Sequence, residues 1–297
     1  MPRWEKSSTT KIVLLIGVIA VSFSAIFIRL STAPPLALAF YRMFFATIAL
    51  LPIALTRDSS RNQIMDLTGK QLLLMTGAGL FLSIHFGVWV ISLSHTTVAS
   101  SVVLVTTQPI FLTFFEYFLL KKKPSNKLLL GILIATVGGT LIGYGDLLGS
   151  QAKVLGDLLA LSGALMAAGY FFIGGTVRQK LNNIPYITVV YGITAIFLLI
   201  FCLLMQVPLV GYSAYNMGLF LLLALVPTLI GHTSFNWALK DIRASRVGTT
   251  ILGEPVGASI LAAIMFKEVP GPIPAVGGLI VLIGIYVVWK TKSRPRP

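Results

Sequence analysis

The sequence predicts an all-α integral membrane protein whose ten transmembrane helices form two inverted repeats of five. The first observation is composition: of 297 residues, 56% are hydrophobic and only 11% are charged, and the mean hydropathy is +0.90. Soluble domains carry about 25% charged residues. The second is a succession of apolar runs, each near the ~20 residues that a helix needs to cross a bilayer. The third is an internal repeat.

The repeat is anchored by a polar residue and a proline in the middle of an apolar segment. Gln108 precedes Pro109 in the first copy, and Glu254 precedes Pro255 in the second, 146 residues further on. Because proline removes a backbone hydrogen bond, both prolines are expected to kink their helices. The same spacing pairs five further positions: Gly17 with Gly163, Lys121 with Lys267, Pro124 with Pro270, Gly131 with Gly277, and Gly138 with Gly284.

The apolar runs divide equally between the two copies, which cover residues 11–145 and 155–290. Five spans is an odd number, so the second copy crosses the membrane in the opposite sense to the first. Inverted repeats of this kind recur in secondary transporters. Loops are short apart from residues 56–69. The expected spans are 11–30, 35–55, 70–92, 97–120, 127–145, 155–177, 185–206, 216–239, 244–266 and 273–290.

The first span needs its own justification, because it follows Arg3, Lys6 and Lys11 and so has the charge pattern of a signal peptide. We expect it to be a permanent helix. Its removal would leave nine spans, and Gly17 has a counterpart in the second copy.

Two charged residues lie deep in spans: Arg42 in the second and Glu254 in the ninth. A charge near the bilayer midplane costs about 2.5–3.5 kcal/mol on insertion scales and marks a pathway or a buried partner. Glu254 is a candidate substrate or proton site, with a structural carboxylate as the alternative, and Gln108 holds the matching place. Arg42 could anchor an anionic substrate, pair with Glu254 or bind backbone carbonyls. Glu116, near the end of the fourth span, is expected to extend toward the basic loop at Lys121.

Aromatic and neutral polar residues complete the set of candidates. His85 and Trp89 lie in the third span, Tyr170 in the sixth, and His232 and Asn236 in the eighth. Aromatic walls with a few polar groups suit a small organic ligand, and histidine can carry protons near neutral pH. Interhelix packing is the alternative for each residue. No metal site is expected, because no further ligands stand at a suitable spacing.

The fifth span carries a different pattern. Ala135, Gly139 and Gly143 recur every four residues, which predicts a small-residue face for close helix contact.

The basic residues decide the expected orientation. With the N-terminus inside, 19 of the 23 Lys and Arg residues fall in cytoplasmic segments, three fall outside, and Arg42 lies within a span. Cytoplasmic loops carry an excess of these residues, so both termini are expected in the cytoplasm. The net charge of +14 therefore reports membrane topology rather than a nucleic-acid-binding surface.

Over its whole length the chain resembles the EamA family of the drug/metabolite transporter (DMT) superfamily. One departure is that Lys122 and Lys123 stand where a glutamate often closes the fourth helix. The matching residues are Tyr41-Arg42, Gln108-Pro109, Glu254-Pro255-Val256, Phe266-Lys267-Glu268, Gly277 and Gly284.

The resemblance implies an inner-membrane transporter, often an exporter, of amino acids or related small organic metabolites. It also implies a central cavity between the third, fourth, eighth and ninth helices, with the first and sixth completing it. The expected partners are a small-molecule substrate and the lipid bilayer, with a homodimer left open and no nucleic acid. No cofactor is expected, and proton coupling is a hypothesis. A flippase for lipid-linked substrates or a passive facilitator is the alternative, whereas an enzyme is not expected, since no catalytic motif is visible.

Overall fold

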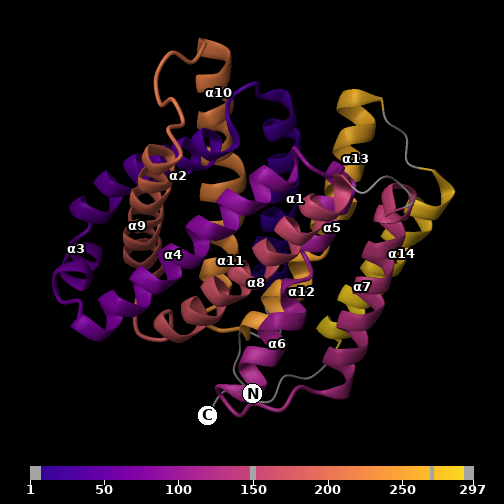
Figure 1. Cartoon of the computed structure of the whole chain (residues 1–297). Coiled ribbons are helices and arrows are strands. Elements are labelled where there is room, and N and C mark those ends of the chain that lie inside the picture. Colours follow the sequence, from indigo (N-terminus) through magenta and orange to yellow (C-terminus); the bar gives the residue numbers. More distant parts are fainter. Residues whose placement is uncertain (1–7, 148–151, 268–270, 291–297) are drawn as a thin grey trace.

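The computed structural model describes residues 8–147, 152–267 and 271–290, and the regular structure in these ranges is helical (Figure 1). The helices of the first copy are α1 (Ser8–Leu30), α2 (Pro35–Thr56), α3 (Asp58–Met65), α4 (Gly69–Ser92), α5 (Val98–Val105), α6 (Gln108–Phe118) and α7 (Asn126–Leu147). Those of the second are α8 (Ala152–Val177), α9 (Asn183–Leu204), α10 (Ala214–Leu223), the π-helix η2 (Ala224–His232), α11 (Thr233–Ala238), α12 (Ala244–Ile251), α13 (Glu254–Phe266) and α14 (Pro272–Trp289).

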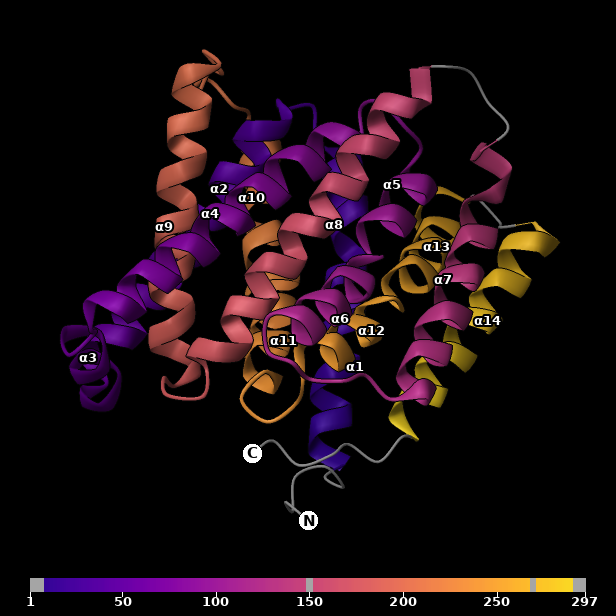
Figure 2. The same ribbon diagram turned by 60° about the horizontal axis from the view of Figure 1, so that its bottom comes forward.

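The ten-span fold is confirmed. Nine helical spans of the described chain are long and apolar enough to cross a bilayer, and the shorter apolar helix at Asn126–Ile142 supplies the tenth. The loop expected at residues 56–69 contains the short helix α3, which the sequence did not indicate. The first turn of α1 and the last turn of α14 lie at the same end of the bundle, as an even number of crossings requires (Figure 2).

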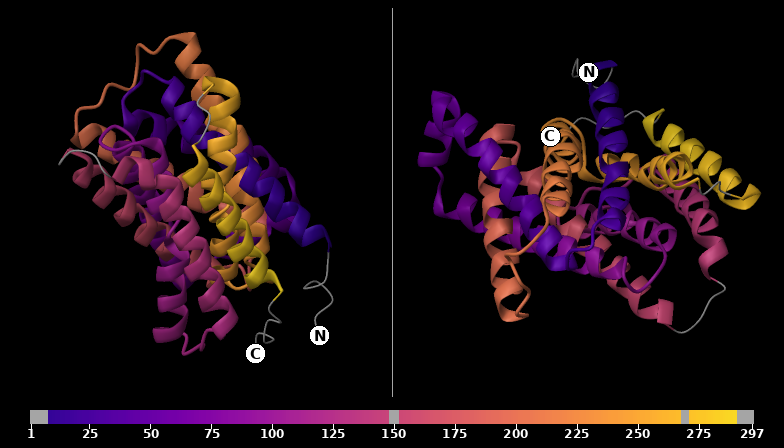
Figure 3. Two further views of the ribbon diagram at one scale, coloured as in Figure 1. Left: turned by 90° about the vertical axis from the view of Figure 1, so that its right-hand side faces the viewer. Right: turned by 90° about the horizontal axis from the view of Figure 1, so that it is seen from above.

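The two copies interlock rather than standing side by side. Helix α4 of the first copy packs on α8 of the second, and η2 of the second copy packs on α1 of the first. These are the same pairing with the two copies exchanged. The remaining spans pair with their own counterparts: α2 with α9, α6 with α12, and α7 with α14. Helices α7 and α14 lie side by side at one edge of the bundle (Figure 3). This reciprocal pairing is what an inverted repeat produces.

The fourth and ninth spans are broken rather than kinked. Helix α5 ends at Val105 and α6 begins at Gln108, while α12 ends at Ile251 and α13 begins at Glu254. Each proline is the second residue of a new helix. Proline is well tolerated there, because the first turn of a helix has no internal acceptor for its N–H groups. The expected kinks at Pro109 and Pro255 are therefore full interruptions that separate two short helices.

A further match between the copies appears where these spans end. Lys121, just after α6, has a φ of 53°, and Lys267, just after α13, has a φ of 57°. Both residues thus take the left-handed conformation that normally favours glycine. They are counterparts at the 146-residue spacing, so the backbone turns in the same way in both copies.

Small residues do bring helices together, but along a different face of α7 from the one expected. A Cβ on Gly131 would lie 2.8 Å from the carbonyl oxygen of Gly284 on α14, and Ala135 belongs to the same contact. Gly139 instead faces Val103 at an ordinary distance of 3.5 Å. The side-chain surroundings of Gly143 lie outside what the structure describes. The face follows a spacing of three and four residues because that is the period of a helix.

Candidate functional site

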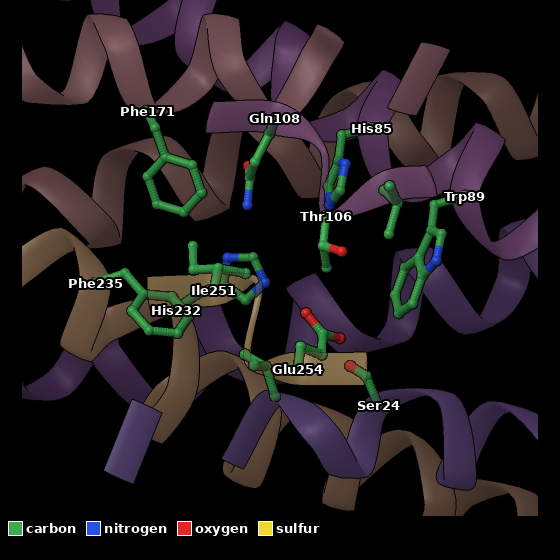
Figure 4. Close-up of a pocket in the computed structure, with 12 residues that line it drawn as sticks. Ser24, His85, Trp89, Thr106, Gln108, Phe171, His232, Phe235, Ile251 and Glu254 are labelled. Atoms are coloured by element: carbon green, nitrogen blue, oxygen red, sulfur yellow. The ribbon is translucent and has the colours of Figure 1, made fainter. Parts of the chain in front are cut away.

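A small, largely buried cavity lies where the two broken spans meet α1, α4, α8 and the η2–α11 segment (Figure 4). Its free volume is about 20 Å³, which holds about one water molecule. Five of the eight candidates from the sequence line it, together with seven further residues. The lining consists of Val21, Ser24, His85, Trp89, Val105, Thr106, Gln108, Phe171, His232, Phe235, Ile251 and Glu254.

Glu254 is the first residue of α13, and its side chain is only 7% exposed. The carboxylate points into the cavity, with Ser24 beside it and Thr106 across from it (Figure 4). In the described part of the chain this carboxylate has no hydrogen-bond partner and no direct ion-pair contact, although its charge interacts with that of Arg42 at longer range. The Glu254 backbone oxygen accepts a bond from Ser22 Oγ at 3.4 Å. A helix N-terminus favours a nearby negative charge, so the break in the ninth span supports a carboxylate there.

Gln108 occupies the same place in the first copy, as the first residue of α6. Its amide reaches into the cavity from the side opposite Glu254 (Figure 4). Among the described residues its Oε1 has no hydrogen-bond partner. A buried polar atom without a partner is rare in folded proteins and indicates a site for water or a ligand.

The two histidines flank the cavity in different ways. His85 Nδ1 lies 2.9 Å from the carbonyl oxygen of Gly163 on α8, and its ring stacks on Trp89. A carbonyl only accepts, so Nδ1 carries the hydrogen and Nε2 is left free. His232, at the end of η2, stacks on Phe171, and its Nδ1 has no partner within the described chain.

Arg42 lies behind the cavity wall rather than in it. It is 1% exposed, and its Nε donates to Thr228 Oγ1 at 2.6 Å while Nη1 donates to Ser24 Oγ at 3.2 Å. Its guanidinium also stands 4.1 Å from the ring centroid of Phe86. Over the described ranges Arg42 makes no direct ion-pair contact with Glu254, but the two buried charges attract each other at longer range. The direct partners of the Arg42 guanidinium are therefore two hydroxyls and an aromatic face, and its Nη2 has no partner there.

Asn236 and Tyr170 form a separate buried cluster outside the cavity lining. Asn236 Nδ2 donates to Tyr170 Oη at 2.5 Å, to Tyr191 Oη at 3.3 Å and to the His232 carbonyl at 2.9 Å. Arg178 supports the cluster through its Nε, which donates to the Asn236 carbonyl at 3.0 Å. The sequence placed Arg178 in a cytoplasmic loop, but the structure buries it. Burial lowers the pKa of Arg178 to about 10, so it remains cationic at neutral pH.

Glu116 lies near the end of α6, and its hydrogen-bond partner lies on α12. It is buried, and its carboxylate accepts from the backbone N of Ser245 at 3.2 Å and from Ser245 Oγ at 2.7 Å. It therefore holds the first turn of α12, which is the helix whose end leads into Glu254.

Several lining residues were not singled out from the sequence, although the repeat spacing could have found them. Ser24 is the counterpart of Tyr170, and Phe235 is the counterpart of Trp89. The remaining new lining residues are apolar or carry a hydroxyl, and nothing in an apolar span distinguishes them. Across the residues that the structure describes, no three His, Cys, Asp or Glu side chains gather to hold a metal ion.

Comparisons with known proteins agree with this architecture. The EamA-like transporter family matches residues 9–144 and again residues 154–290. An uncharacterized transporter of Archaeoglobus fulgidus is 23% identical over 287 residues, covering 95% of this chain and 97% of that relative. The uncharacterized transporter YdfC of Bacillus subtilis is 26% identical over 281 residues, covering 92% and 87%. A solved structure titled "Crystal structure of protein" shares the fold, with a TM-score of 0.78 at 16% identity over 95% of this chain and 97% of that one.

Proposed function

The chain belongs to the EamA-like transporter family, and from this premise we propose that it exports amino acids or related small organic metabolites across the cytoplasmic membrane by alternating access. The observation that carries the proposal is the meeting of two interrupted helices at a small buried cavity, lined by a carboxylate that has no hydrogen-bond partner in the described chain. Interrupted helices that meet between inverted repeats are a recurrent plan for midplane substrate sites. Glu254 and Gln108 are the proposed substrate-binding residues.

Alternating access is supported by what lies on either side of the cavity. A pocket of about 200 Å³ opens at the end of the bundle where α6 ends and α12 begins, between Glu116, Gln179 and Arg243. Another of about 260 Å³ opens at the opposite end, between Arg29, Ser31 and Ser94. The cavity between them is too small for an organic solute. We infer that each half-channel widens in turn, while the other stays closed.

The proposed orientation puts both termini in the cytoplasm. It can be checked with single cysteines in a chain whose native Cys202 is replaced by alanine. Val210→Cys, in the loop after α9, should react with a membrane-impermeant maleimide on intact cells. Lys123→Cys, in the loop after α6, should react only after permeabilisation. The reverse pattern would contradict the orientation without affecting the fold.

Proton coupling is proposed to run through Glu254, because a carboxylate with no partner can hold either a proton or a substrate. The other titratable or charged groups near it are His85, His232 and Arg42. Flux driven by an imposed proton gradient should collapse when an uncoupler is added. Flux that is indifferent to both gradient and uncoupler would remove the coupling but leave the carrier.

The main test is counterflow in proteoliposomes with pooled labelled amino acids, nucleosides and small organic cations. At least one solute should accumulate with the wild type and fail to accumulate with Glu254→Gln. The matched control is Asp157→Asn, which alters a half-buried carboxylate that accepts a hydrogen bond from Thr96 Oγ1 at 2.8 Å and lines neither the cavity nor the two end pockets. It should retain counterflow in whatever protein stays folded. Absence of counterflow for the whole pool would contradict transport of soluble metabolites.

One observation favours a second candidate, a flippase for lipid-linked substrates. A groove of about 410 Å³ with almost wholly apolar walls runs along α1, α13 and α14. Ser22 and Gly257 line this groove, and Ser22 Oγ also lies 3.4 Å from the Glu254 backbone oxygen. A lipid tail could occupy that groove while its head group enters the cavity. Saturable counterflow of a soluble solute would reject this candidate in favour of the first.

A further inference from the structure

We propose that the substrate of the central cavity carries a protonated amine, which binds the Glu254 carboxylate among neutral oxygens and aromatic faces, so that the protein selects compounds with a free amine over their N-acylated, anionic counterparts. This inference rests on the proposed transport function. It also goes beyond it, because the family match assigns no substrate charge.

The first observation is the charge carried by the residues that line the cavity. Of the residues that line the cavity in the described chain, Glu254 alone is formally charged. The other polar groups are hydroxyls, an amide, imidazoles and the indole N–H of Trp89, which has no hydrogen-bond partner in the described chain. Glu254 is only 7% exposed and makes no direct ion pair in the described chain. Arg42 attracts its charge from behind the cavity wall, and a cation or a proton in direct contact would compensate it further. The cavity therefore favours a positively charged occupant.

The second observation is the position of Arg42, a buried cation close to the cavity. Arg42 is not part of the lining, and Ser24 stands between its guanidinium and the cavity. Its Nε donates to Thr228, its Nη1 donates to Ser24, and its face lies on the Phe86 ring. Its Nη2 has no hydrogen-bond partner in the described chain, but Arg42 is not among the residues that line the cavity. A substrate carboxylate entering the cavity would thus find no basic side chain on the wall. It would also meet the Glu254 carboxylate at close range.

The third observation is the fit of an ammonium group, which has three N–H donors and no acceptor. Glu254 supplies the charged acceptor. Gln108 Oε1 is a buried acceptor without a partner. Thr106 Oγ1 gives its own hydrogen to the Val102 carbonyl at 2.8 Å, so its lone pairs remain available. Figure 4 shows these three side chains converging on the same space from α13, α6 and the end of α5.

Aromatic rings complete the site. Trp89, Phe171 and Phe235 form much of the remaining wall (Figure 4). The face of an aromatic ring attracts a cation, most strongly when both are shielded from water. The ring faces give no comparable attraction to an anion, so the donor that an anion would find among these three residues is the indole N–H of Trp89. The rings also accommodate the apolar body of an amine.

The test uses the purified full-length protein and matched compounds on phenylethyl and isoamyl skeletons. Each skeleton is offered as the free amine, the amino acid methyl ester, the amino acid and the N-acetyl amino acid. The first two are cations, the third is a zwitterion and the last is an anion. We expect the amine and the ester to bind at least tenfold more tightly than the N-acetyl compound in calorimetric titrations. Binding of the N-acetyl compound alone, or of no amine on either skeleton, would overturn the proposal.

Relocating the carboxylate separates a binding role from a structural one. Glu254→Gln should lose amine binding. The double variant Gln108→Glu with Glu254→Gln places the carboxylate on the repeat counterpart across the same cavity, and it should recover part of that binding. A merely structural carboxylate would not be rescued by this exchange. Failure of the double variant to bind amine, with its thermal unfolding unchanged from the wild type, would count against the proposal.

Counterflow with the same compounds distinguishes recognition of the amine from transport of a soluble solute. If the N-acetyl compound exchanges and the amine does not, the protein is a carrier but its substrate is not a cation. If the amine binds but none of the compounds exchanges, amine recognition stands and the proposed transport of soluble metabolites fails.

Discussion

Gly138 on α7 and Gly277 on α14 lie in mutual backbone contact, since a Cβ on either would stand 2.6 Å from the carbonyl oxygen of the other. Gly131 and Gly284 make the same contact, at 2.8 Å and 2.7 Å. In the repeat Gly131 corresponds to Gly277, and Gly138 corresponds to Gly284. Exchanging the two copies therefore converts one contact into the other. The fifth and tenth spans therefore meet about the axis that relates the inverted halves.

The first prediction concerns this contact between α7 and α14. Gly277→Ala should destabilise the protein by on the order of 1–3 kcal/mol, because the new methyl group would overlap backbone atoms that cannot rotate away. Thermal unfolding in detergent measures the effect. Gly139→Ala is the matched control, since its Cβ would meet only Val103 at 3.5 Å. It should leave the unfolding temperature unchanged or raise it. Equal losses in both variants would show that the close approach of α7 and α14 is unimportant.

The second prediction concerns the contact between α1 and α13, next to the candidate substrate site. A Cβ on Gly257 would stand 2.1 Å from Ser22 Oγ and 2.9 Å from Ser22 Cβ. Gly257→Ala should force the helices apart, lowering stability by about 1–3 kcal/mol and displacing Glu254 from the cavity. Adding Ser22→Gly removes both clashing atoms and should restore most of the thermal stability and the counterflow.

Ser22→Gly alone serves as the control for this pair. It leaves a glycine inside a helix, which costs about 1 kcal/mol. The double variant should therefore be more stable than the sum of the two single losses predicts. Simple additivity of the two losses would contradict the proposed contact.

Arg42 gives a third prediction. Arg42→Lys keeps the charge but cannot maintain both hydroxyl bonds, to Thr228 and to Ser24. Hydrogen bonds to a charged group contribute about 1.5–3 kcal/mol, so a loss in that range is expected in thermal or denaturant unfolding. Arg61→Lys is the control, because its ion pair with Asp58 is exposed and should contribute well under 1 kcal/mol. Comparable shifts in the two variants would exclude a special role for the buried guanidinium.

Much of the fold and part of the site could be predicted because the bilayer imposes strong rules. A polar side chain in an apolar span must face the interior of the bundle. That rule selected Glu254, Gln108, His85 and His232, and all four line one cavity. The inverted repeat accounts for the arrangement of the other spans, because counterpart spans of the two copies pack on each other.

What could not be predicted depends on contacts that no local pattern encodes. The hydroxyl that holds Arg42 belongs to Thr228, inside a π-helix whose wider turn sets where that side chain lies. Asn236 looked like a cavity residue, yet its amide turns to Tyr170 and Tyr191. The breaks in the fourth and ninth spans also lie before the prolines rather than at them. In each case helix spacing gave the depth of a residue in the membrane but not its partners.

The last prediction tests the turn that both copies share. Lys121 and Lys267 adopt left-handed backbone angles, which cost a residue other than glycine roughly 1–2 kcal/mol. Replacing either lysine by glycine relieves that strain but adds freedom to the unfolded chain, worth about 0.5–1 kcal/mol in the opposite direction. Each variant should thus be more stable by up to about 1 kcal/mol, and the two effects should add, because the sites lie at opposite ends of the bundle. Lys123→Gly, whose φ is not positive, should give no gain in the same thermal unfolding series. A loss of stability in both Lys121→Gly and Lys267→Gly would mean that the lysine side chains themselves hold the turns, and that the shared backbone angle is incidental.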